Sequence, residues 1–117
     1  MQNFVYIAAS NVLRKDADDL STEEGFNVVN DGAVQIDTGT GELFIFERDD
    51  LDTPVLQINL RAARIRLFRT FSRHYNHFGV TMTVVGKFDR DKREIVTIKM
   101  ERESRDVLRE AIGRIGL

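Results

Sequence analysis

The sequence predicts a mainly β fold, a curled antiparallel sheet or barrel of about seven strands that is capped by a C-terminal α-helix. Short runs of alternating apolar and polar residues recur along the chain, which is the period of a half-buried strand. Glycine, asparagine and aspartate separate several of these runs, as in the tight turns between antiparallel strands. After the last run the apolar spacing becomes that of an amphipathic helix, which would close one end of the sheet.

The first half of the chain has the pattern of an antiparallel meander. A first strand is predicted over residues 4–12, although residues 11–20 would equally fit one or two turns of helix. Further strands are predicted at residues 26–29, 33–37, 42–48 and 55–60. Turns are assigned to residues 30–32, 38–41 and 49–54, because these segments are rich in residues that favour tight turns.

Residues 60–78 fit two different periods. With a period of two, Ile65 and Leu67 point inward while the arginines between and before them point outward, as in a strand. With a period of 3.6, a helical stripe is formed by Leu60, Ala63, Leu67, Phe71, Tyr75 and Phe78. The arginines fall on every side of such a helix. We therefore favour a strand over residues 63–69, followed by a loop or irregular turn to Gly79.

The end of the chain contains a hairpin followed directly by a helix. Strands are predicted at residues 80–85 and 94–100, and Gly86 is a candidate for a β-bulge. The helix is predicted at about residues 103–115, with Ser104 as its N-cap and Gly116 at its C-terminus. Its buried face is predicted to comprise Val107, Leu108, Ala111, Ile112 and Ile115.

Length and composition indicate one domain over residues 1–117. A chain of 117 residues has the usual size of one domain and can bury a single core. It has no cysteine, no apolar stretch near the roughly 20 residues of a membrane span, and no basic start typical of a signal peptide. These features predict a soluble, intracellular protein, cytoplasmic by default. The oligomeric state is left open by the sequence.

Charge is unevenly distributed along the chain, although the net charge is only −2. Residues 16–24 carry five acidic residues and no basic one. Between Asp52 and Asp89 there is no acidic residue but six basic ones, which are Arg61, Arg64, Arg66, Arg69, Arg73 and Lys87. Such a basic segment is typical either of solvated surface that protects a sheet edge or of an anion-binding surface.

The order of these elements resembles that of the pleckstrin-homology-like superfold, which includes the PH and PTB domains. The resemblance covers most of the chain from about Gly32 onward. The spacing IxLxxAxI is formed by Ile58, Leu60, Ala63 and Ile65. A hairpin follows, and its last strand runs into the helical segment SRDVLREAIGRI. The chain has no tryptophan, and Leu108 stands where the closing helix of this family typically carries one.

The resemblance implies a binding module, and this superfold serves lipid binding, phosphopeptide binding and protein docking alike. Members that bind phosphoinositides usually carry lysine and arginine at the end of the first strand and on the second, since phosphates need convergent cations. Arg14 and Lys15 would be the lipid-binding residues here, in an alternative function at the membrane surface. The acidic segment after them, and the absence of bases in residues 26–36, argue against that alternative.

Our main hypothesis is a non-enzymatic protein-interaction domain, a scaffold or adaptor, that docks a partner at the edge of the strand over residues 63–69. Related domains accept an extended peptide there by strand addition. Acidic or phosphorylated peptides would be bound by Arg64, Arg66, Arg69 and Arg73. A second alternative is a nucleic-acid interface over residues 61–78, with the aromatic side chains Phe68, Phe71, His74 and Tyr75. The negative net charge makes nucleic acid the less favoured partner.

No residue cluster specifies catalysis or metal binding, so we expect no enzyme activity and no cofactor. His74 and His77 are three residues apart, but no acidic residue nearby in sequence would orient or complete a site. The acidic segment lacks the glycine and glutamate of a calcium-binding loop, since Ser21 and Asn27 stand at those positions. Residues 38–41 lack the lysine of a phosphate-binding loop.

Overall fold

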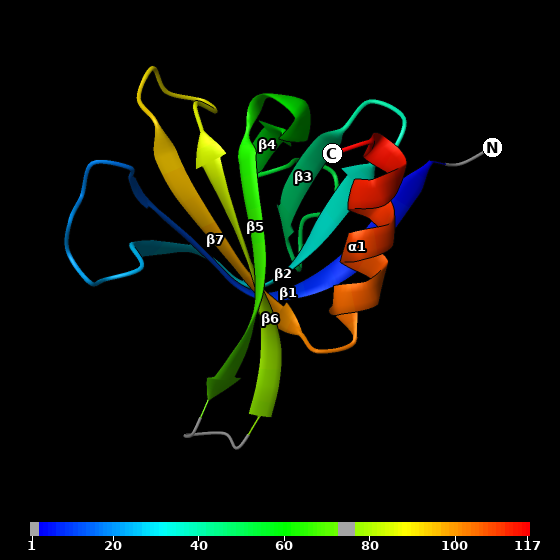
Figure 1. The fold of residues 1–117 in the computed structure, drawn as a ribbon, viewed down its shortest axis with the longest axis horizontal. Coiled ribbons are helices and arrows are strands. Elements are labelled where there is room, and N and C mark those ends of the chain that lie inside the picture. Colours follow the sequence, from blue (N-terminus) through cyan, green and yellow to red (C-terminus); the bar gives the residue numbers. More distant parts are fainter. Residues whose placement is uncertain (1–2, 73–76) are drawn as a thin grey trace.

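The computed structural model describes residues 3–72 and 77–117, with the side chains of all these residues except 70–72, 77 and 78. Over these ranges the chain forms seven antiparallel strands in one curled sheet, a half-barrel, and one C-terminal helix (Figure 1). The mainly β fold predicted from the sequence is confirmed. In the described part of the chain, no helix has the length and apolar character required to span a membrane.

The elements follow one another with short connections. The strands are β1 (Phe4–Asp16), β2 (Phe26–Asp37), β3 (Glu42–Glu47), β4 (Leu56–Asn59), β5 (Arg64–Ser72), β6 (His77–Gly86) and β7 (Glu94–Glu101). A single 3₁₀ turn, η1 (Leu60–Ala62), joins β4 to β5, and the helix is α1 (Ser104–Ile115). The sheet order is β4-β3-β2-β1-β7-β6-β5. The first and last strands therefore pair, while β4 and β5, adjacent in sequence, form the two edges of the described sheet.

The segment with two possible periods is a strand. β5 confirms the strand predicted over residues 63–69 and excludes the helix. The loop predicted up to Gly79 is wrong for residues 70–72 and 77–79, because β5 continues to Ser72 and β6 already begins at His77. Residues 73–76 of that predicted loop lie outside the described residues. β5 and β6 pair in unbroken register from Arg64, opposite Val85, to the far end of both strands. The two strands form an arm that extends beyond the rest of the sheet (Figure 1).

The first two strands are longer than the sequence predicts. β1 is continuous to Asp16, so the helical alternative for residues 11–20 is wrong. The turn predicted at residues 30–32 is also wrong, since β2 runs through these residues and pairs with β1 and then β3. A Cβ on Gly32 would lie 2.3 Å from the backbone oxygen of Phe46. Close approach of two strands, and not a turn, therefore explains this glycine.

The hairpin of β6 and β7 is present as predicted and supplies much of the core. The two strands pair without a register shift, so Gly86 ends β6 opposite Glu94 and forms no bulge. Their inward side chains are Val80, Met82, Val84, Val96, Ile98 and Met100. These residues join apolar side chains from β1 to β4 in one core cluster. The concave side of the curled sheet is thus the apolar side.

α1 covers this concave side. Leu108, Ala111 and Ile115 are its buried residues and belong to the same core cluster as the strands. Toward the C-terminal end, a Cβ on Gly41 of the β2–β3 turn would lie 3.3 Å from Cγ2 of Ile115. Val107 was predicted on the buried face but is 42% exposed. The helix therefore packs one narrow apolar stripe across the sheet.

The ends of α1 agree with the sequence prediction in part. The predicted range 103–115 is correct to within one residue, and Gly116 ends the helix in the left-handed conformation with φ 86°. Ser104 is the first helical residue and not the N-cap. Glu103 occupies the cap position without a side-chain capping hydrogen bond. The N-terminal end of α1 therefore lacks a side-chain cap from this position.

We expect Leu108→Ala to lower the free energy of unfolding by about 2–5 kcal/mol, because it would leave a cavity between α1 and the sheet. Val107→Ala is the matched control, since it changes an exposed neighbour on the same helix and should cost less than about 0.5 kcal/mol. Chemical denaturation of both variants measures the difference. Small and equal losses would show that α1 contributes little to the core.

Candidate anion-binding site

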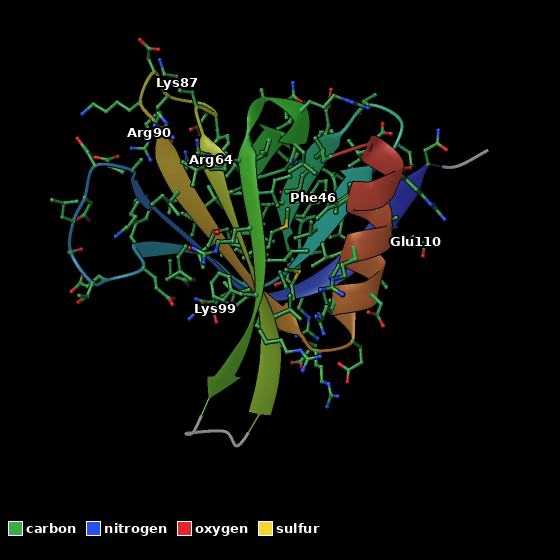
Figure 2. All side chains as sticks on the ribbon, viewed as in Figure 1. Phe46, Arg64, Lys87, Arg90, Lys99 and Glu110 are labelled. Carbon is green, nitrogen blue, oxygen red and sulfur yellow. The ribbon has the colours of Figure 1, made fainter. Side chains whose placement is uncertain are left out.

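β5 presents an open backbone edge. It pairs with β6 on one side only, so the N–H and C=O groups on its other side have no strand partner in the described sheet. Arg64, Arg66 and Phe68 are exposed on one face of the strand, whereas Ile65 and Leu67 pack against the core from the other. Arg64 stands at the upper end of β5 in Figure 2. The predicted alternation is therefore confirmed for this part of the strand.

Arg69 does not lie with the other two arginines. β5 and β6 pair without a register shift, so residues an odd number apart on β5 point to opposite faces. Arg69 shares its face with Ile65 and Leu67, pairs with Val80 of β6 and is exposed. The sequence hypothesis grouped Arg69 with Arg64 and Arg66, and the structure separates it from them. Arg73, the fourth predicted residue, lies outside the described residues.

Arg69 instead lines a pocket together with arginines that the sequence hypothesis did not include. The pocket has a volume of about 220 Å³ and is lined by Arg69, Gly79, Val80, Arg102, Arg105 and Asp106. It forms where β5 and β6 pass the segment that leads from β7 into α1. Gly79 pairs with Glu101 at the end of β7, and this register brings the first turn of α1 beside β6. We call this site the arginine pocket.

The arginine pocket has an excess of positive charge. Arg109, one helical turn beyond Arg105, adds a fourth guanidinium. Repulsion from Arg109, and next from Arg69, lowers the pKa of Arg105, and attraction by Asp106 offsets this only in part. Across residues 3–72 and 77–117, none of the four guanidiniums has an ion pair or a side-chain hydrogen bond. The pocket is thus an electropositive site that the described protein does not neutralise.

The sequence contains one signal for this site. Arg102, Arg105 and Arg109 are spaced three and four residues apart, which places them on one side of a helix and its approach. Their meeting with Arg69 depends on the register between β6 and β7. That register is a long-range property of the fold, and the local spacing does not contain it.

Arg14, proposed for the lipid alternative, is buried and forms hydrogen bonds with two carboxylates. Its Nε and Nη2 donate hydrogen bonds to the two carboxylate oxygens of Glu94, at 2.9 and 2.6 Å. The same guanidinium donates to both oxygens of Asp89, and Arg90 donates to Glu94 at 3.3 Å. The bond with Asp89 raises the pKa of Arg14, and in turn lowers the pKa of Asp89. This network ties β1 to the start of β7.

Lys15, the other residue of the lipid alternative, is also engaged. Its Nζ donates to the backbone oxygens of Ser21 and Glu23, at 3.1 and 3.0 Å. These bonds fold the acidic segment between β1 and β2 back onto β1. Arg14 is buried and Lys15 is held by its own loop, so these two side chains do not converge on a common surface site.

The structure describes only part of the surface that the nucleic-acid alternative requires. Phe68 is 41% exposed on the same face of β5 as Arg64 and Arg66. His74 and Tyr75 lie outside the described residues, and so does the side chain of Phe71. One aromatic side chain and two arginines are therefore the part of this alternative that the structure brings together.

Known proteins offer no template for the site. Comparison of the chain with protein-family models, with curated proteins and with solved structures finds no match. The function must therefore be argued from the two features on this side of the molecule, the open edge of β5 and the arginine pocket.

We expect Arg14→Met to lower the free energy of unfolding by about 3–5 kcal/mol, because the buried carboxylate of Glu94 would lose its main cation. Adding Glu94→Met should restore part of the loss, since no unpaired buried charge would remain. Arg48→Gln is the control, because it removes an exposed ion pair with Asp31 and should cost at most about 1 kcal/mol. Equal stabilities of the single and double variants would contradict this account.

The same network predicts a dependence of stability on pH. The pKa of Asp89 is lowered in the folded protein, so its contribution is present above the ordinary aspartate pKa of about 4 and is lost as the pH falls through the lowered value. In Arg14→Met this contribution is missing at every pH. The stability difference between the wild type and Arg14→Met should therefore shrink below about pH 4. Denaturation midpoints measured across pH 2–7 test this, and a constant difference would contradict it.

Proposed function

We propose that the protein is a non-enzymatic interaction module that binds an extended, acidic segment of a protein partner along the edge of β5. The observation that carries the proposal is that β5, a strand of nine residues, lies at an edge of the sheet with Arg64, Arg66 and Phe68 exposed. We further propose that the fold is pleckstrin-homology-like. The order of the elements, seven antiparallel strands and then a helix packed on the concave side, supports that assignment.

The backbone of β5 would supply affinity for an added strand. An extended segment laid along β5 would form main-chain hydrogen bonds with the N–H and C=O groups on its open side. These bonds do not depend on the side chains of the partner. Affinity from this source is therefore available to many sequences, and selection must come from the residues on either face of β5.

Arg64, Arg66 and Phe68 would supply the selection. Side chains of an added strand alternate between its faces, so every second residue of the partner would lie beside one of these three. Within the described protein neither Arg64 nor Arg66 has an ion pair or a side-chain hydrogen bond, so both charges are available. Acidic residues opposite the arginines and an apolar residue opposite Phe68 fit this face. The favoured partner thus has the pattern acidic-x-acidic-x-apolar.

We expect the double substitution Arg64→Gln and Arg66→Gln to leave the fold intact, since exposed charges contribute only about 0–1 kcal/mol each. Its affinity for a synthetic peptide of the pattern above should fall about tenfold or more, because losing charge-assisted interface contacts costs about 2 kcal/mol. Fluorescence anisotropy at fixed salt measures the affinity. Arg48→Gln with Arg114→Gln is the control, which removes the same charge elsewhere and should bind like the wild type.

Two measurements on backbone hydrogen bonds test strand addition itself. Binding should protect amides on the open side of β5 from hydrogen exchange, and N-methylation of the peptide residues that face β5 should abolish binding. Unchanged affinity of the Arg64 and Arg66 variant would contradict the proposal. Preferential binding of random single-stranded RNA, with a steep loss in salt, would instead favour the nucleic-acid interface. Binding to phosphoinositide vesicles and to no peptide would favour the lipid alternative.

A further inference from the structure

We infer that the arginine pocket is a phosphate-binding site, and that it takes a phosphate monoester carried by the peptide segment docked on β5. The inference that a peptide carries the phosphate rests on the proposed function. The inference that the pocket binds an anion rests on the geometry and charge of the pocket alone.

Unpaired positive charge is the first argument. Arg14, Arg48, Arg90 and Arg114 each hold a carboxylate within the described protein. Among the described residues the four arginines of the pocket region hold none, and neither do Arg64 and Arg66. The pocket arginines differ from these two in that they converge from β5, the β7–α1 turn and α1, where their mutual repulsion lowers the pKa of Arg105. Convergence of like charges is unfavourable unless a counter-charge is present. A bound anion is the counter-charge that this arrangement lacks.

The amount of charge favours a phosphate over a carboxylate. Three arginines and one aspartate on the lining leave an excess of two positive charges. A phosphate monoester carries about −1.5 to −2 at neutral pH and presents three strong acceptor oxygens, whereas a carboxylate carries one charge on two oxygens. Guanidinium groups bind such oxygens in pairs, so Arg69, Arg102 and Arg105 together can occupy all three.

The space is also suitable. A volume of about 220 Å³ is several times the roughly 30 Å³ share of one water molecule, so a group of several heavy atoms can enter. Gly79 contributes no side chain to the wall, and Val80 beneath it is buried and belongs to the core. The arginines therefore surround an open space instead of filling it.

Arg69 connects the pocket to the proposed peptide edge. It lies on β5, on the face opposite to Arg64 and Arg66. In an added strand, a residue opposite Arg69 would be three positions from the residue opposite Arg66, and its side chain would point to the pocket face. The preferred segment therefore carries its phosphorylated residue an odd number of positions from its acidic residues. The phosphorylated side chain then lies on the opposite face of the added strand, the face with Arg69.

The test compares two synthetic peptides that share the acidic-x-acidic-x-apolar pattern, one with a phosphoserine three positions from the acidic residue opposite Arg66. We expect the phosphorylated peptide to bind about tenfold more tightly or better. The substitutions Arg102→Gln and Arg105→Gln together should bring the ratio of the two dissociation constants close to one. Arg48→Gln with Arg114→Gln should preserve the ratio. A ratio near one in the wild type would overturn the inference.

A second measurement separates the pocket from the peptide edge. Titration with inorganic phosphate, followed by NMR, should shift the amide signals of Gly79 and Arg105 in the wild type and not in the variant that lacks Arg102 and Arg105. Phosphate binding without any peptide binding would support the pocket and refute docking on β5. Peptide binding without a phosphate response would refute the pocket and support the edge. Preference for phosphoinositide vesicles over the phosphopeptide, through the same arginines, would overturn the peptide source.

Discussion

The pairing of β1 with β7 is the constraint on which the rest of the structure depends. It joins the meander of β1 to β4 to the hairpins of β5 to β7, and it runs from Ala9, opposite Met100, to Asp16, opposite Glu94. Arg14 reinforces it by bridging to Glu94, 80 residues away in sequence. Because η1 leads directly from β4 to β5, closing the sheet at its centre leaves these two strands as its edges. The open backbone of β5 thus follows from the topology.

The arginine pocket has a similar origin in the fold. Two turn residues separate the end of β7 from the start of α1, so the chain must turn sharply onto the concave side of the sheet. That turn carries Arg102 and directs Arg105 toward β6, where the register of β5 and β6 places Arg69. The helix that covers the core therefore also brings the cations together. Changes that shift α1 would alter both the core and the pocket.

Local sequence patterns were sufficient to predict the elements that depend on residues close together in the sequence. The alternation of Ile65 and Leu67 identified β5, and the spacing of Leu108, Ala111 and Ile115 identified α1. Composition misled at residues 30–32, where Gly32 is required by the approach of β3 and not by a turn. The strand period alone would have placed Arg69 on the face opposite to Arg64. Sequence could not show that Arg14 is buried, because its partners Glu94 and Asp89 are far away along the chain.

The exposed arginines of β5 have a consequence for the state of the free protein. An open strand edge is a template for any other edge, including that of a second copy, and like charges on both copies oppose such pairing. Arg64 and Arg66 would therefore keep unbound molecules apart by the same electrostatic property that would attract an acidic strand. Occupation of β5 would neutralise the repulsion and hide the edge in one event. Protection against self-association and the choice of a partner would then be two results of one arrangement of charge.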